Sequence, residues 1–302
     1  PFMPGPALRP AGGIRPPRAG CDCFVSTSRV TIREKPALHG ADGLKVVVLG
    51  NSATAGDGLE DRSLAWPFVS GRVLQQALGV PLEIDNVTVF AKGPRAAGYA
   101  LSKVEAANPD IVIVSLGAYL CSVRVVAEQV RHLFGDRAAR QYLRLERRFD
   151  RKTATGSAAV RKANRAARSL IHRIIGARPT ATVDEVVAVW EEVLHRLARL
   201  EGTQTIVFTD PRWPAQVAEA NKGAQSAQDE LFRRVKLIAD SHRFPWAAAE
   251  DAFALAPDRD ALYLHDGVHK SIEGHRIQAQ ALLEVLRPQV AARATAVGAL
   301  LP

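Results

Sequence analysis

The chain has few cysteines and no long apolar run, and these two absences limit the classes of protein to which it can belong. Three cysteines among 302 residues are too few for a disulfide framework. Cys21 and Cys23 are separated by a single residue, and no second ligand pair follows at the spacing of a zinc site, so we expect no metal. The longest apolar stretches, such as Lys45–Gly50, are far shorter than a membrane span requires. We therefore expect no transmembrane segment.

Several targeting and nucleotide-binding signals are also missing. No N-terminal stretch combines a basic start, an apolar run and a small-residue cleavage site, so a cytoplasmic location is expected, with the reservation that the chain begins with proline and its start can be processed. The sequence contains neither a Gly-x-x-x-x-Gly-Lys phosphate loop nor a dinucleotide fingerprint. Nucleotide-dependent chemistry is therefore not indicated.

The charge is unevenly distributed. The composition, with 47% apolar and 24% charged residues, is that of a soluble globular protein, and the net charge is +9. Fifteen lysines and arginines fall in residues 124–178, which carry few acids. A solvated helical surface explains such a run, and the alternative is a surface for an anionic partner such as phospholipid or an acidic carrier protein. Without a recognition motif or interleaved aromatic residues, no nucleic acid is expected as a partner.

The hydrophobic pattern predicts an α/β domain at residues 44–290. A disordered, Pro- and Gly-rich lead-in with a possible edge strand at 24–34 is expected for residues 1–43, and a tail for residues 291–302. Short apolar strands alternate with helical segments, which indicates a parallel sheet with helices on both faces. The predicted strands are 44–49, 84–90, 111–116 and 205–209, and the predicted helices are 66–78, 97–107, 215–241 and 274–286. Residues 122–200 are read as a basic helical insertion or lid.

In a parallel sheet, ligands bind beyond the carboxyl ends of the strands, and the first of these ends carries a serine. Gly50–Gly56 places Ser52 between a strand and a helix, where its hydroxyl can project near N–H groups that favour developing negative charge. The small neighbours Ala53 and Ala55 leave the approach open. Taken alone the pattern is weak, because a turn serine that caps the next helix explains it as well.

A second polar cluster stands near the C-terminus and contains three histidines. A serine hydroxyl needs a base to remove its proton, and that base needs a third group to orient it. Asp266 precedes His269 by three residues, so its carboxylate can fold back to the imidazole Nδ1–H while Nε2 faces the serine. His265 lacks this spacing, and His275 lies one turn into the last helix, where a structural role fits better. We therefore predict a catalytic triad of Ser52, Asp266 and His269.

Together these segments resemble the SGNH/GDSL hydrolase family. Gly50–Gly56 is similar to the family's Gly-Asp-Ser-x-x-x-Gly block, with Asn51 in place of the aspartate, and residues 266–269 are similar to its Asp-x-x-His block. Residues 109–117 resemble the strand that leads to the family's Gly-x-Asn-Asp block. The likeness covers about residues 44–286 and implies a flavodoxin-like three-layer α/β/α sandwich with a central parallel sheet and a helical insertion. It also implies a serine esterase that works without a metal or an organic cofactor.

The residues of the oxyanion hole depart from the family pattern. The resemblance assigns this role to the backbone N–H groups of Ser52 and Gly93, with Ala96 as the alternative in another register. Gly93 fits better, because close backbone approach favours glycine. Tyr119 stands where the family has a donor asparagine, and losing one such donor typically costs about 10²–10³ in rate.

Two basic residues, Lys92 and Arg95, flank this region. They are candidates for binding an anionic substrate or for replacing the missing amide, and the alternative is that both are surface residues. The leading hypothesis is an enzyme that cleaves an ester, thioester or O-acyl bond of a small or carrier-bound substrate through an acyl-enzyme on Ser52. An acyltransferase using the same triad, or a catalytically impaired binding protein of the same fold, are the alternatives.

Overall fold

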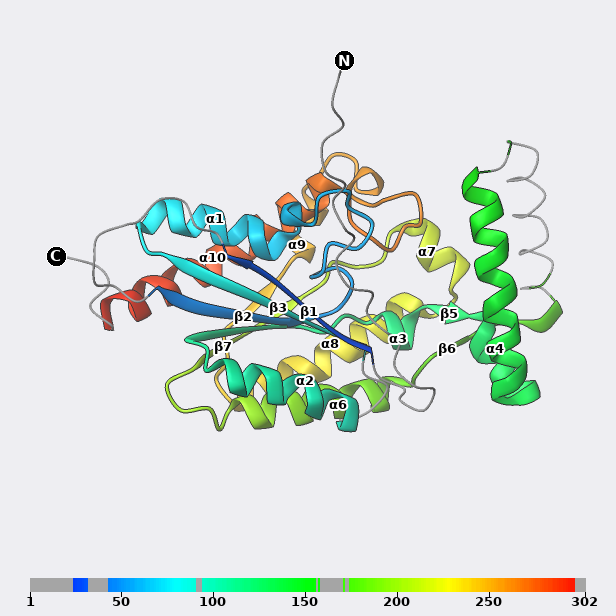
Figure 1. Ribbon diagram of the computed structural model, residues 1–302, viewed down its shortest axis with the longest axis horizontal. Coiled ribbons are helices and arrows are strands. Elements are labelled where there is room, and N and C mark those ends of the chain that lie inside the picture. Colours follow the sequence, from blue (N-terminus) through cyan, green and yellow to red (C-terminus); the bar gives the residue numbers. More distant parts are fainter. Residues whose placement is uncertain are drawn as a thin grey trace, which may run out of the picture.

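The computed structural model describes residues 24–31, 43–90, 94–155, 157, 171 and 174–296, which fold around a six-stranded sheet (Figure 1). The strands of this sheet are β1 (Phe24–Thr31), β2 (Leu44–Gly50), β3 (Leu82–Phe90), β4 (Ile111–Ser115), β7 (Gln204–Thr209) and β8 (Trp246–Ala248). The helices are α1 (Trp66–Leu78), α2 (Pro94–Ala107), α3 (Tyr119–Ser122), α4 (Val126–Thr155), α6 (Val183–Leu197), α7 (Ala215–Ala220), α8 (Ala224–Ser241), α9 (Glu250–Ala254) and α10 (Ile272–Ala296). Arg62–Leu64 and Asp260–Leu262 form 3₁₀ turns, and β5 (Arg124–Val125) pairs with β6 (Arg178–Pro179).

The sheet order is β1-β3-β2-β4-β7-β8, with β1 antiparallel at one edge and the other neighbours parallel. Numbered along the chain, the five parallel strands run 2-1-3-4-5, which is the flavodoxin-like order. The chain reverses direction across the sheet between β2 and β4. The crevice that this reversal opens at the carboxyl ends of the strands is where such folds bind ligands.

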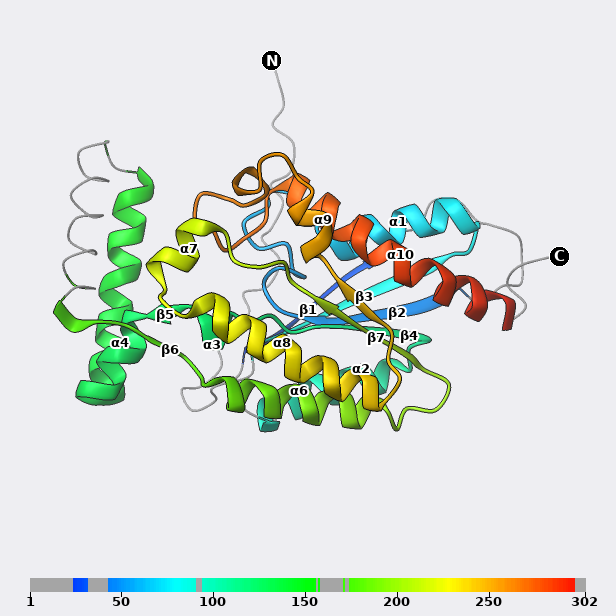
Figure 2. The ribbon, with the colours of Figure 1, turned by 180° about the vertical axis from the view of Figure 1, so that it is seen from behind.

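The core lies in two layers, one on each face of the sheet. Successive side chains of a strand point to opposite faces, so Val46 and Val48 pack towards α1 and α10, whereas Val47 and Leu49 pack towards α2, α6 and α8. Figures 1 and 2 show these two helical layers on either side of the strands. Because both faces are covered, the central strands β2 and β4 are largely apolar. The predicted three-layer α/β/α fold is confirmed.

The structure divides the segment 122–200 into two parts with different surroundings. Helix α6 starts at a capping box formed by Thr182 and Glu185 and buries Trp190, which is 0% exposed, in the core of the sandwich. Helix α4 instead stands apart from the sandwich, beyond β5 and β6 (Figures 1 and 2), and carries a non-helical break at Gly135. The exposed arginines on α4 include Arg137, Arg140, Arg144 and Arg148. An anionic partner for this surface remains a prediction.

Three details differ from the elements predicted from the sequence. Strand β8, at the sheet edge, follows a proline and is only three residues long, too short for a recognisable apolar run. The predicted helix 215–241 is interrupted before Gly223, whose φ of 88° is left-handed, so it forms α7 and α8. Helix α10 continues into the expected tail, as far as Ala296, because Val290 and Ala294 pack into the core. Within the described ranges, no helix combines the length and hydropathy that crossing a bilayer requires.

Candidate active site

The loop after β2 is held in one conformation by its own polar groups. Asn51 Oδ1 accepts from the Ala53 N–H at 2.9 Å, and Thr54 Oγ1 donates to the Asn51 carbonyl at 2.8 Å. The buried Asn86 of β3 donates to the Thr54 carbonyl at 2.7 Å. A side chain at Gly50 would collide with Thr54, at 2.1 Å from its Cγ2, so the loop can turn tightly only with glycine there. This network fixes the backbone on both sides of Ser52.

Ser52 itself is left available by this network. Its carbonyl accepts from Asp57 N–H, but its own N–H and its Oγ make no hydrogen bond to any described residue. A free backbone N–H beside a free hydroxyl is what a serine nucleophile needs to stabilise its own oxyanion. The arrangement therefore suits Ser52 for attack on a carbonyl.

The loop that carries Asp266 and His269 is a compact turn closed by the Leu264 N–H, which donates to the His269 carbonyl at 2.7 Å. Its tip is Gly267, with φ of 69°, where an added Cβ would lie 2.3 Å from Gln216 Nε2. Asp266 Oδ2 lies 2.7 Å from His269 Nδ1, and Oδ1 accepts from the N–H groups of Val268 and His269, each at 2.9 Å. The fold-back spacing thus gives direct contact between carboxylate and imidazole.

Charge and hydrogen bonding keep the carboxylate ionised. Burial by itself acts to raise the pKa of Asp266, but the hydrogen bonds from the His269 ring and from two backbone N–H groups outweigh it and hold that pKa well below its usual range. The ionised carboxylate favours a proton on Nδ1 and leaves Nε2 as the nitrogen that can accept one.

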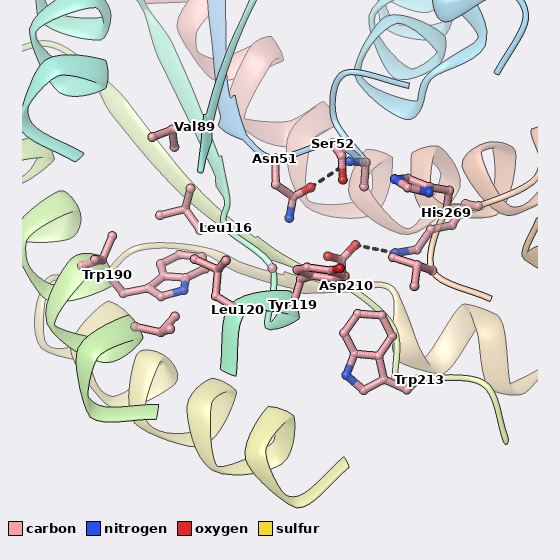
Figure 3. A pocket seen from close by; sticks show the side chains of 16 residues that line it. Asn51, Ser52, Val89, Leu116, Tyr119, Leu120, Trp190, Asp210, Trp213 and His269 are labelled. Atoms are coloured by element: carbon pink, nitrogen blue, oxygen red, sulfur yellow. Dashed lines mark hydrogen bonds and ion pairs between the residues drawn. The ribbon is translucent and has the colours of Figure 1, made fainter. Parts of the chain in front are cut away.

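Ser52 and His269 line the same pocket at the carboxyl ends of β2, β3 and β4 (Figure 3). The two loops pack directly on each other, since a Cβ at Gly58 would lie 3.5 Å from that of His269. No hydrogen bond joins the hydroxyl to the imidazole, a looseness that is common in catalytic sites without substrate. The pocket is lined by Asn51, Ser52, Ala53, Val89, Leu116, Gly117, Tyr119, Leu120, Val186, Val189, Trp190, Asp210, Trp213, Val268, His269 and Lys270.

A buried ion pair lies beneath the His269 loop. Lys270 Nζ donates to Asp210 Oδ1 at 3.1 Å, and Gln278 Nε2 donates to the same oxygen at 3.0 Å. The side chain of Lys270 is only 4% exposed and that of Asp210 11%. Because Lys270 directly follows His269 and Asp210 directly follows β7, the pair fastens the histidine loop to the end of a central strand.

The other residues predicted for the site fall into two groups. Tyr119 opens α3 and lines the pocket, and burial raises the pKa of its phenol, so it is neutral. Lys92, Gly93 and the side chain of Arg95 lie outside the described residues, so the assigned oxyanion glycine and the two basic residues stay predictions. Helix α2 begins at Pro94, which places the alternative, Ala96, in its first turn.

The rival histidines lie away from Ser52. His265 is exposed and lines a separate groove on the far side of Asp266, together with Arg124 and Asn221. His275 is 0% exposed, and its Nδ1 accepts from the Trp66 N–H at 3.3 Å, at the start of α1. His275 thus joins the first turn of α1 to α10, which is a structural role.

We expect His275 to make folding sensitive to mild acid. Burial, followed by the nearby positive charge of Lys270, lowers its pKa from 6.5 to about 3. Below about pH 6.5 this histidine is therefore protonated in the unfolded chain but stays neutral in the folded chain. The free energy of unfolding consequently falls as the pH drops from about 6.5 towards 3, by at most about 1.4 kcal/mol per pH unit.

Urea unfolding at several pH values between 4.5 and 7.5 measures this dependence. His275→Gln should flatten the curve in that window, because its amide can still accept from Trp66 but does not titrate. The matched control is His195→Gln on the exposed side of α6. If both variants keep the wild-type pH dependence, His275 is not the group responsible.

Sequence reasoning missed three polar residues that line the pocket, Asn51, Asp210 and Lys270. The sequence pattern assigns no role to Asn51, yet its amide lines the pocket, and an added Cβ on Gly117 would lie 2.5 Å from its Nδ2. Asp210 directly follows the predicted strand 205–209, and this place at the end of an apolar strand is a usable signal for a pocket residue. Lys270 gave no signal beyond following the predicted base.

Among the described residues, no group of three or more His, Cys, Asp or Glu side chains could hold a metal ion.

Comparison with known proteins identifies the fold. No protein-family model and no curated protein matches the chain. Among solved structures, an acetylxylan esterase from Geobacillus stearothermophilus, described as a catalytic mutant, matches with a TM-score of 0.50 and 16% identity over 84% of this chain and 96% of its own. A lipase/acylhydrolase from Enterococcus faecalis matches with a TM-score of 0.50 and 17% identity over 82% and 96%. The chain therefore has the three-layer fold of these proteins.

Proposed function

We propose that the protein is a serine esterase that cleaves an acyl ester through an acyl-enzyme on Ser52. The observation that carries the proposal is the contact of Asp266 with His269 Nδ1 at 2.7 Å, in a loop that shares a pocket with an unpaired serine hydroxyl. Ser52 precedes Asp266 and His269 by more than 200 positions in the chain, yet the serine and the histidine line one pocket at the strand ends. Few structural roles require this combination.

The chemistry follows from the geometry. His269 Nε2 removes the proton as Ser52 Oγ attacks the carbonyl, and Asp266 stabilises the imidazolium that forms. His269 then gives the proton to the leaving oxygen, which departs, and the acyl group remains on Ser52. Water, deprotonated by the same histidine, releases the acid and restores the hydroxyl.

The structural neighbours support these roles. Three structures of the acetylxylan esterase are described as catalytic mutants, at a serine, at an aspartate and at a histidine three positions after that aspartate. Asp266 and His269 have the same spacing and follow Ser52 in the same order. The same residue types on the same fold support the same division of roles.

We also propose that Asn51 supplies an oxyanion donor in place of the family's asparagine. Its Oδ1 is engaged by Ala53, which directs Nδ2 into the pocket, where it has no acceptor among the described residues. The Ser52 N–H, unpaired as well, would be a second donor. Tyr119 stands in the sequence where the family has that asparagine, and it lines the same pocket.

Exchanging the donor between the two positions tests this role. Asn51→Ser keeps an oxygen for the Ala53 N–H but removes the amide, and we expect kcat to fall about 10²- to 10³-fold. Adding Tyr119→Asn to that variant should raise its kcat at least tenfold. Circular dichroism checks that Asn51→Ser is folded, and a small effect on kcat in the folded variant would exclude Asn51 as a donor.

Fluorophosphonate labelling tests the proposed function directly, because this reagent reacts with activated serines. Mass spectrometry of the digested protein should place the label on Ser52. Ser63→Ala, on the same loop, is the matched control and should be labelled like the wild type, whereas Ser52→Ala and His269→Ala should not be labelled. A wild-type protein that is folded and never labelled would rule out the esterase proposal.

A further inference from the structure

The pocket has two chemically different halves on either side of Ser52. One half contains His269, Lys270 and Asp210. The other is formed by apolar side chains from four different elements: Val89 from β3, Leu116 after β4, Leu120 from α3, and Val186, Val189 and Trp190 from α6. Figure 3 shows Val89, Leu116, Leu120 and Trp190 gathered on the side of Asn51 away from His269. This apolar half is called the acyl chamber below.

The position of His269 determines which part of the substrate enters each half. Since the imidazole must give a proton to the leaving oxygen, the leaving group lies on the His269 side. The acyl substituent on the attacked carbon then points the other way, into the acyl chamber. This assignment rests on the proposed function of the same pocket.

The side chains that line the acyl chamber are apolar and suit a hydrocarbon chain. Val89, Val186 and Val189 are each 4% or 5% exposed, and Leu116 is 8% exposed. None of the residues that form it carries a charge, so a polar sugar hydroxyl or a carboxylate entering it would lose its hydration with little compensation. A methylene chain has no hydrogen bonds to water to lose, and its removal from water is favourable.

The size of the pocket limits the length of that chain. The two halves together have a cavity volume of about 50 Å³, and because a water-sized group needs about 10–15 Å³, three to five such groups fit in the whole pocket. Trp190, wholly buried between the sheet and α6, closes the inner end. An acetyl group fills only part of this space, and a chain of ten or more carbons exceeds it.

We infer that the protein acts on esters of short to medium unbranched acyl chains, of about four to six carbons, rather than on acetyl esters. The selectivity comes from burying methylene groups in the acyl chamber. Each methylene contributes roughly fourfold to kcat/KM. Butanoyl and hexanoyl esters, with two and four more methylenes, should therefore exceed the acetyl ester about 15- to 250-fold in kcat/KM.

A series of p-nitrophenyl esters from acetate to decanoate measures this preference in the full-length protein. We expect kcat/KM to rise to four to six carbons and to fall by ten. Leu120→Trp fills the acyl chamber from α3 and should lower the hexanoate-to-acetate ratio at least tenfold, while Leu120→Ala should move the optimum to longer chains. Leu200→Trp, also a partly buried leucine packed on the same core layer but outside the pocket, should leave the ratio unchanged.

The outcomes separate the acyl chamber from the esterase proposal. If acetate is hydrolysed as well as the longer esters, or if Leu120→Trp leaves the ratio unchanged, the inference is wrong although ester hydrolysis stands. If no ester is hydrolysed and no serine is labelled, the proposed function fails. Thermal unfolding then still decides on the acyl chamber: hexanamide raises the melting temperature above that with acetamide if the chamber binds alkyl chains, and equal curves overturn it.

Discussion

Replacing Ser52 with alanine should lower kcat for a short-chain aryl ester by about 10⁴- to 10⁶-fold. The variant keeps the N–H of residue 52 and the hydrogen bonds of Asn51, Thr54 and Asn86 that hold the loop. Only the nucleophile is removed, so the melting temperature should stay close to that of the wild type. Initial rates measured with excess enzyme give the residual activity.

The histidine gives an independent check of the same prediction. Because serine and base act as one unit, His269→Ala should cost about as much as Ser52→Ala, and the double variant should be little worse than either. Ser63→Ala serves as the matched control. A Ser52→Ala enzyme that retains a tenth of the wild-type kcat, in a preparation free of contaminating esterase, would disprove the acyl-enzyme mechanism.

Replacing Lys270 with methionine should reduce the free energy of unfolding by about 3–5 kcal/mol. The change leaves the Asp210 carboxylate buried with Gln278 as its remaining side-chain donor. The double variant Lys270→Met, Asp210→Asn should recover most of this loss, since it removes the uncompensated charge. Urea unfolding measures the free energy of unfolding of both variants, provided that its dependence on urea concentration is the same as in the wild type.

The appropriate control is an exposed ion pair of the same type. Lys236→Met breaks the contact with Asp240 on the surface of α8, where such a pair contributes about 1 kcal/mol or less. If Lys270→Met is as mild as Lys236→Met, the buried pair does not hold the histidine loop. A Lys270→Met protein that is stable but slow would instead indicate that the loop has moved without unfolding.

The sequence predicted the sheet well because its strands are buried on both faces. Runs such as Val46–Leu49 and 111–116 are apolar without alternation, and the structure uses them as the central strands β2 and β4. Strand β8 escaped prediction because its three residues, Trp-Ala-Ala, form a strand only by pairing with β7. Pairing across the sheet is a tertiary contact, and no local pattern records it.

The candidate site divides in the same way between local and distant contacts. The contact of Asp266 with His269 is local, three positions apart, and could be read from spacing. The pair of Asp210 and Lys270 spans 60 positions, and nothing in either neighbourhood identifies the other. Val186, Val189 and Trp190 of α6 belong to the core, as their apolar side chains alone would suggest, and only the fold shows that their row also borders the pocket.

Helix α6 therefore serves two purposes with one row of side chains. Trp190 belongs at once to the interior that keeps the protein folded and to the surface that meets a ligand. Any change there that admits a larger molecule also loosens the packing of the sandwich. New substrate preferences should consequently arise more readily at Leu120, which is only partly buried, than along α6, where each gain in room is a loss in stability.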